Sequence, residues 1–266
     1  MTSSEKTLSV ITAVAPHLAT YLPETAASVD RLRALASSAG WTVSWVLTSD
    51  GPGLPGHYSP DVLVVPERSA GVSASRNYAL GFVDTEWILS LDADDLVVPE
   101  GVLAALTDHA DSEWIIGSHQ VFGSNTDPTP PQEFVEIPRG ELDHHLAGPF
   151  FYPNGLIARI DSVLLSGGWP ATRVNEDMGL IRALSRTGPG AFSPHVIVRV
   201  RRWDRQTTAH PSFLDNALAR QFQAELDRAA ARAQGRQAPR TRLVELDMNG
   251  RPYPLRLSYE HYDKLP

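Results

Sequence analysis

Two aspartates separated by one residue follow an apolar run near residue 90. Asp92 and Asp94 come directly after Trp87–Leu91, whose composition predicts a buried strand. Two carboxylates on a turn can converge on one hard divalent cation, and Mg²⁺ or Mn²⁺ held in this way takes further oxygens from substrate phosphates. The alternative is a solvated acidic turn. A calcium loop of the EF-hand type is excluded, because aliphatic residues stand where an oxygen ligand, a glycine and a glutamate are required.

A second candidate is the segment Gly71–Asn77, which opens a helix predicted over Ala70–Phe82. Its small residues allow close approach to the backbone, and a helix N-terminus favours anions. Arg76 can make a forked contact with a phosphate. The alternative is a plain helix start that carries a surface arginine.

An acidic pair, Glu176 and Asp177, begins another predicted helix shortly after the segment Gly167–Pro170. Acidic residues at a helix N-terminus are also what helix capping produces. A carboxylate at this position could equally be a general base, provided that it faces a substrate pocket.

The elements that must position these residues alternate between strand and helix. The predicted strands are Leu8–Val14, Trp41–Leu47, Asp61–Val65 and Trp87–Leu91, and the predicted helices are Leu22–Ala39, Ala70–Phe82 and Pro99–His109. This alternation predicts an α/β fold with a mainly parallel sheet covered by helices. Ligands bind beyond the carboxyl ends of such strands. Thr12, Asp50 and the aspartates at 92–95 all fall there.

The second half of the chain is less regular. It holds predicted strands at Gly155–Ile160 and Val196–Val200, predicted helices at Glu176–Ser185 and Pro211–Ala233, a loop at Asn125–Gln132, and a hairpin over Thr241–Leu257 around Asn249-Gly250. We expect a catalytic domain over residues 1–210, with a nucleotide-binding half at about 1–98 and an acceptor-binding half at about 99–210. Residues 211–266 would form a helix and hairpin arm that docks on the core or joins two copies as a homodimer.

Composition excludes several classes of protein. Acidic residues number 31 and basic residues 23, so the net charge of −8 argues against a general nucleic-acid binder. The absence of cysteine excludes disulfides, zinc ribbons, iron–sulfur clusters and cysteine nucleophiles. No apolar run approaches the length of about 18 residues needed for a membrane span, and the N-terminus lacks a basic leader. We therefore expect a soluble, cytoplasmic protein.

Taken together, these segments resemble the family 2 glycosyltransferases. The resemblance covers roughly residues 7 to 205, and its most specific part is the Asp-x-Asp-Asp segment followed by the Gly-Gly-Trp and Glu-Asp segments. It implies a GT-A fold, a nucleoside-diphosphate sugar donor with a UDP-sugar favoured, a divalent cation (Mn²⁺ or Mg²⁺), and inversion at the anomeric carbon.

The resemblance also implies roles for single residues. Asp94 would bind the cation, with Asp92 as a second ligand or in contact with the ribose or a metal-bound water. Asp177 would be the general base, with Glu176 beside it orienting the donor or acceptor sugar.

Donor contacts are implied at the strand ends. Thr12 and Ala13 would line the nucleobase and ribose, and Asp50 would accept a hydrogen bond from the base. Trp169 would form an apolar wall for a sugar ring. The full implied donor set is Thr12, Ala13, Asp50, Arg76, Asp92, Ala93, Trp169, Arg202 and Arg205.

The segment after the last core strand departs from the family. Many members have Arg-Arg-His there, whereas this chain has Arg201-Arg202-Trp203. Phosphate contacts from Arg202 or Arg205 therefore stay open. His210 is a candidate for a displaced metal ligand, with a surface or packing role as the alternative.

Two other functions compete with a glycosyltransferase. A phosphatase of the haloacid-dehalogenase type also places Asp-x-Asp after a strand, but it needs Thr or Val where Leu96 stands and a later strand-borne lysine, and the only lysines are Lys6 and Lys264. The second is a non-catalytic sugar-nucleotide-binding protein.

The acceptor of a glycosyltransferase would be a small molecule, a carrier-bound intermediate or an oligosaccharide. Contacts with it are expected from His144, His145, Phe150, Phe151 and Tyr152.

Overall fold

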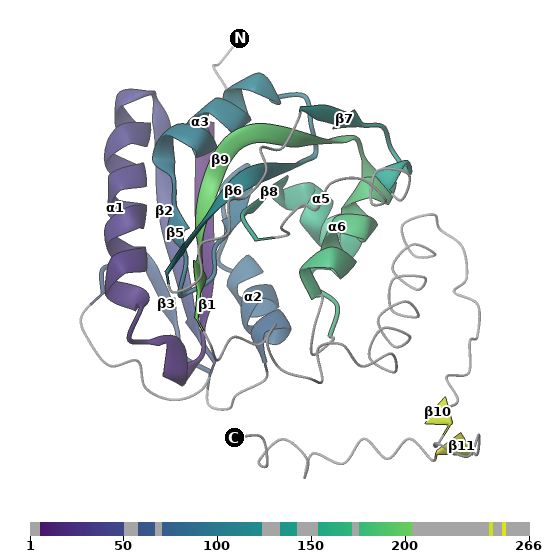
Figure 1. The fold of residues 1–266 in the computed structure, drawn as a ribbon, viewed down its shortest axis with the longest axis horizontal. Coiled ribbons are helices and arrows are strands. Elements are labelled where there is room, and N and C mark those ends of the chain that lie inside the picture. Colours follow the sequence, from purple (N-terminus) through teal and green to yellow (C-terminus); the bar gives the residue numbers. More distant parts are fainter. Residues whose placement is uncertain are drawn as a thin grey trace.

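The computed structural model describes residues 6–50, 58–66, 71–123, 134–142, 154–171 and 176–203, together with two short strands at 245–246 and 252–253. Within these residues the chain forms one large sheet with helices on both faces (Figure 1). The predicted loop at 125–132, the predicted helix Pro211–Ala233, the five expected acceptor residues, Arg205 and His210 lie outside the described residues.

The sheet is mixed, and most of its strands run in one direction. Its strands are β1 (Lys6–Val14), β2 (Trp41–Ser49), β3 (Val62–Val64), β4 (Trp87–Ser90), β5 (Leu96–Val97), β6 (Trp114–Gly123), β7 (Val135–Ile137), β8 (Leu156–Arg159) and β9 (Gly190–Arg202). Their order is β3-β2-β1-β4-β8-β6-β9-β5, and β7 pairs with β9. The first four strands pair in parallel, β8 is antiparallel to both β4 and β6, and β9 runs parallel to β6.

The helices form two layers that cover opposite faces of the sheet (Figure 1). They are the short 3-10 helix η1 (Pro16–Leu18), α1 (Leu22–Ser38), α2 (Val72–Leu80), α3 (Pro99–Asp108), α5 (Ile160–Ser166) and α6 (Glu176–Thr187). Helices α1 and α3 bury one core, and α2, α5 and α6 bury the other. Neighbouring residues of one strand enter opposite cores, as Val10 and Ile11 of β1 do, which explains why the central strands are apolar at nearly every position.

The predicted α/β architecture is confirmed. The sequence did not reveal five elements, namely η1, β5, β6, β7 and α5. Strand β6 begins with an apolar run but continues through buried Ser118 and His119, so its pattern is typical neither of a buried nor of a half-exposed strand. Strand β7 and helix α5 are too short for their periodicity to be recognised. Strand β9 also begins earlier than expected, at Gly190.

The C-terminal tail contains the predicted strand pairing. Strand β10 (Glu245–Leu246) pairs antiparallel with β11 (Pro252–Tyr253). The predicted turn at Asn249-Gly250 lies outside the described residues. The division into a catalytic domain and an arm, and the docking of that arm, stay predictions.

Helix α3 approaches β9 so closely that only glycine fits at Gly101. A Cβ atom there would lie 1.8 Å from the carbonyl oxygen of Val196. We expect Gly101→Ala to lower the free energy of unfolding by about 1–3 kcal/mol, the usual effect of overpacking, measured by urea unfolding. Gly81→Ala is the matched control, because its Cβ would meet only ordinary contacts at helical φ, and it should change stability by less than about 1 kcal/mol. Equal unfolding midpoints for the two variants would contradict this packing.

Candidate functional site

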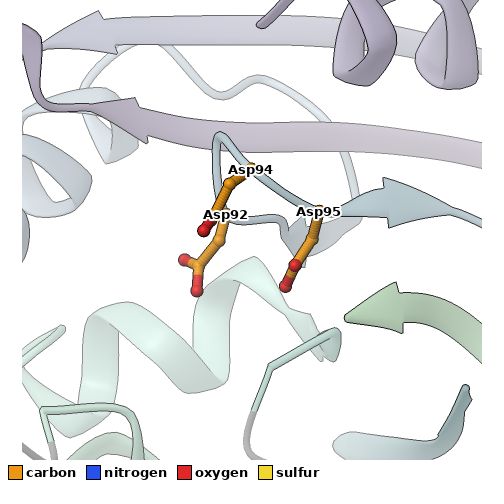
Figure 2. A group of neighbouring side chains, drawn as sticks. All are labelled: Asp92, Asp94 and Asp95. Carbon is orange, nitrogen blue, oxygen red and sulfur yellow. The ribbon is translucent and has the colours of Figure 1, made fainter. Parts of the chain in front are cut away.

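Three carboxylates gather on the turn between β4 and β5. The side chains of Asp92, Asp94 and Asp95 point to the same side of this turn (Figure 2), and one carboxylate oxygen from each lies within 4.8 Å of the others. Asp92 and Asp94 are partly exposed, whereas Asp95 is buried. The two aspartates expected to bind a cation are therefore the two that a ligand can reach.

Helix α1 fixes the backbone of this turn. The Thr25 hydroxyl lies 2.7 Å from the carbonyl oxygen of Ala93 and 3.0 Å from that of Asp95. One turn later, Ser28 Oγ accepts a hydrogen bond from the backbone N–H of Val97 at 3.1 Å. Both hydroxyls are fully buried, so the helix satisfies backbone groups that would otherwise lie unpaired in the core.

Asp95 ties the turn to β9 and to the start of β8. Its carboxylate accepts the backbone N–H of Arg201 at 2.7 Å and the side-chain amide of Asn154. Burial, with added repulsion from Asp92 and Asp94, raises the pKa of Asp95 well above its ordinary value. Asp95 therefore holds the turn in place, a role that the sequence did not reveal.

Asp94 receives a hydrogen bond from an unexpected tryptophan. The indole Nε1 of Trp203 donates to Asp94 Oδ2 at 3.0 Å. Burial and the charge of Asp92 raise the pKa of Asp94, and the bond from Trp203 opposes this effect. Oxygen-only donors whose negative charges repel one another suit a hard divalent cation, because the cation would relieve that repulsion. The residues present thus fit Mg²⁺ or Mn²⁺.

The buried guanidinium of Arg76 connects this turn to the acidic pair on α6. Arg76 is 2% exposed, and its Nη2 lies 2.5 Å from Asp92 Oδ1. Its Nη1 lies 3.0 Å from both Glu176 Oε1 and Asp177 Oδ1. Burial opposes the charge of Arg76, but the three carboxylates raise its pKa above the ordinary value. The structure therefore places Arg76 among carboxylates, where the sequence suggested a phosphate.

Asp177 lies in a nearly closed environment. Burial raises its pKa to about 7, and Glu176 and Asp92 add to this, while Arg76 and a hydrogen bond from Trp169 oppose it. The Trp169 indole donates to Asp177 Oδ1 at 2.8 Å. A carboxylate that titrates near neutrality, beside a candidate cation site, has the properties of a general base.

Trp169 is itself clamped by Asn77 of α2. The Asn77 side chain donates to the carbonyl of Trp169 and accepts from its backbone N–H, both at 2.8 Å. Gly168 allows this contact, since a Cβ there would lie 2.3 Å from Asn77 Oδ1. Trp169 is only 1% exposed, so in this structure its contacts are with Asp177, Asn77 and Arg76, and its expected role as a sugar-binding wall stays a prediction.

Thr12 and Asp50, which are expected to contact the nucleotide, lie near the carboxyl ends of β1 and β2. Thr12 is fully buried and accepts a hydrogen bond from the indole of Trp45 at 3.1 Å. Asp50 follows β2, and its carboxylate accepts the backbone N–H of Gly71, just before α2, at 3.0 Å. Ala13 and Ala93, from the same expected donor set, are also buried.

Arg201 and Arg202 face opposite sides of the sheet, because they are neighbours in β9. Arg201 contacts the aspartate turn, where its Nε donates to the carbonyl of Asp94 at 2.9 Å. Arg202 lies near buried His119, whose pKa is lowered to about 4 by burial and by the charge of Arg202. Contacts between Arg202 and phosphate stay a prediction.

Comparisons with known proteins agree with this geometry. Residues 56–166 match the family model described as Glycosyl transferase family 2. The fold is similar to that of S. aureus TarS 1-349 in complex with UDP, with a TM-score of 0.58, 13% identity, and coverage of 84% of this chain and 65% of that chain. The same TarS segment in complex with UDP-GlcNAc gives a TM-score of 0.58, 15% identity, and coverage of 85% and 71%.

These likenesses establish a GT-A fold. The chain spans 65% of the length of the TarS segment bound to UDP and 44% of a longer TarS structure, so part of each compared protein has no counterpart in this chain. No curated protein sequence matches this chain. Within the described residues, no helix is long and apolar enough to cross a membrane.

The ion pairs of Arg76 predict a large effect on stability. We expect Arg76→Met to lower the free energy of unfolding by about 3–5 kcal/mol at pH 8, because three carboxylates lose their buried counter-charge. The loss should be smaller at pH 5, since Asp177 is then protonated. Arg33→Met is the control: Arg33 pairs with exposed carboxylates of Asp30 and Asp61, so its loss should amount to about 1 kcal/mol or less. Urea unfolding at both pH values distinguishes the variants, and equal losses at pH 8 would refute the expected role of Arg76.

Proposed function

Residues 56–166 carry the family 2 glycosyltransferase match within a GT-A fold, and on this premise we propose that the protein transfers a sugar, with inversion, from a nucleoside-diphosphate sugar to a hydroxyl or amine acceptor. The observation that carries the proposal is the position of Arg76, which holds the candidate cation site and the candidate base in one cluster. A UDP-sugar is the favoured donor, and the UDP and UDP-GlcNAc bound to the similar TarS fold support that choice.

The donor nucleotide would bind beyond the carboxyl ends of β1 and β2. Asp50 stands at the end of β2, and the N-terminus of α2 lies beside it. The nucleobase of the donor would lie against Asp50, and the ribose would lie near Thr12 and Ala13. Arg202, and Arg205 beyond the described residues, are the proposed phosphate contacts.

Asp94 and Asp92 would hold the divalent cation, Mn²⁺ or Mg²⁺. When bound, it supplies the positive charge that stabilises the departing diphosphate. Asp95 is committed to the backbone of Arg201 and to Asn154, so its part is to keep the turn in shape.

Asp177 would take the proton of the acceptor hydroxyl as the hydroxyl attacks the anomeric carbon. Its pKa of about 7 suits this task, because a base that titrates near the working pH is both largely ionised and basic enough. Trp169 and Arg76 orient the carboxylate through two hydrogen bonds to Oδ1. Glu176, on the same arginine, would help to position the sugar.

Replacing the base tests the mechanism. We expect Asp177→Asn to lower turnover about 10²–10⁴-fold while UDP binding is retained, since the amide oxygen can still accept from Trp169. Glu176→Gln should lower the rate less and weaken substrate binding as well. The measurement is the single-turnover release of UDP from a UDP-sugar. Asp161→Asn, at an exposed position in the first turn of α5, is the control. Wild-type rates for Asp177→Asn would remove Asp177 from the chemistry.

The same residue predicts a pH profile. Because the base must be ionised and its pKa lies at about 7, the wild-type rate should rise with pH through that region and level off above it. The residual rate of Asp177→Asn should not show this rise. A wild-type rate that is constant between pH 6 and pH 8 would contradict the assignment.

Replacing the cation ligand tests the donor site separately. We expect Asp94→Asn to abolish the Mn²⁺-dependent part of UDP binding and to leave the unfolding midpoint nearly unchanged. Calorimetry with UDP, in the presence and absence of Mn²⁺, measures this effect. The control is Asp84→Asn, an exposed aspartate before β4. Unchanged Mn²⁺ dependence in Asp94→Asn would exclude Asp94 as a ligand.

A further inference from the structure

The end of β9 lies directly against the turn that carries the aspartates. Arg201 makes two bonds there, from its backbone N–H to Asp95 Oδ1 and from its Nε to the carbonyl of Asp94. Trp203 makes a third bond of a different kind, from its indole N–H to the side chain of Asp94 at 3.0 Å. The first two bonds position the turn, whereas the third orients a candidate ligand group.

The indole of Trp203 is supported by an aromatic and charged cluster. Its ring lies 5.8 Å from the ring of Tyr21, at an interplanar angle of 48°. The Arg201 guanidinium lies 4.7 Å from the centre of the same tyrosine ring and 4.5 Å from that of Phe122. Glu24 of α1 pairs with Arg201 at 3.0 Å. These contacts restrict how far the indole can turn away from Asp94.

We propose that Trp203 is a positioning residue of the cation site, which fixes the Asp94 carboxylate in the orientation where it stands beside Asp92. This inference rests on the proposed function, in which these two aspartates hold the cation. An indole N–H donates and has no lone pair for a metal, so Trp203 acts only through Asp94. Hydrogen-bond partners of this kind around ligating groups strongly affect metal affinity.

The choice of a neutral donor has a physical reason. An arginine or lysine at the same place would also orient Asp94, but its positive charge would oppose a cation at the same carboxylate. The indole orients the group and leaves its full negative charge available.

The test is the affinity of the full chain for Mn²⁺ alone, measured from the electron paramagnetic resonance signal of the free ion. We expect Trp203→Phe to bind Mn²⁺ about 10–100-fold more weakly than the wild type. The matched control is Trp114→Phe, which removes an indole bond to the carbonyl of Gly188 on another part of the sheet and should leave the affinity unchanged. Urea unfolding of each variant separates stability from binding.

A second variant tests the hydrogen bond itself. Trp203→Gln keeps a neutral N–H donor and should retain more Mn²⁺ affinity than Trp203→Phe. Wild-type affinity in both variants would overturn this inference while leaving the proposed function intact. Failure of the wild type to bind Mn²⁺ would overturn both this inference and the cation part of the proposed function. A wild-type protein that binds Mn²⁺ but releases no UDP from a UDP-sugar would count against the proposed function alone.

Discussion

One buried guanidinium forms ion pairs with three carboxylates from two other parts of the chain, and the arrangement of the site depends on these ion pairs. Arg76 belongs to α2, Asp92 to the turn after β4, and Glu176 and Asp177 to the first turn of α6. One positive charge cannot balance three negative charges in a medium that excludes water. Burial is the main cause of the raised pKa of Asp177, and repulsion from Glu176 and Asp92 adds to it. Through Arg76, the candidate base and the candidate cation site form one electrostatic unit.

The sheet topology brings these residues to one edge. Strands β1, β2 and β4 run in parallel, so Thr12 near the end of β1, Asp50 after β2 and Asp92 after β4 lie at the same edge of the sheet. The antiparallel strand β8 lies between β4 and β6 and places Asn154 next to Asp95. Helix α1, which covers one face of the sheet, holds the aspartate turn through the hydrogen bond from Thr25 to the carbonyl of Ala93. The apolar strands are buried between the helix layers, so polar side chains gather at the edge of the sheet where the strands end. There they can form hydrogen bonds with loops or bind a ligand.

Local patterns predicted much of this arrangement, and long-range contacts supplied the rest. An apolar run followed by Asp92 and Asp94 can be recognised within ten residues or so, as can the acidic start of α6. The clamp between Asn77 and Trp169 cannot, because its partners lie far apart in sequence and neither residue type is unusual. Arg76 shows the same limit. Its residue type indicates an anion, but only the fold decides whether that anion is a phosphate or a carboxylate.

Asp177 and Asp94, the proposed base and the proposed cation ligand, each accept a hydrogen bond from a tryptophan indole. Trp169 donates its indole N–H to Asp177 at 2.8 Å, and Trp203 donates to Asp94 at 3.0 Å. A neutral donor orients a carboxylate without neutralising it, so the group still attracts a proton or a cation. The charged donor Arg76 is placed instead where three carboxylates would otherwise repel one another. The site thereby uses two kinds of donor: the two indoles orient Asp94 and Asp177 without adding charge, and Arg76 both orients Asp177 and offsets part of the negative charge.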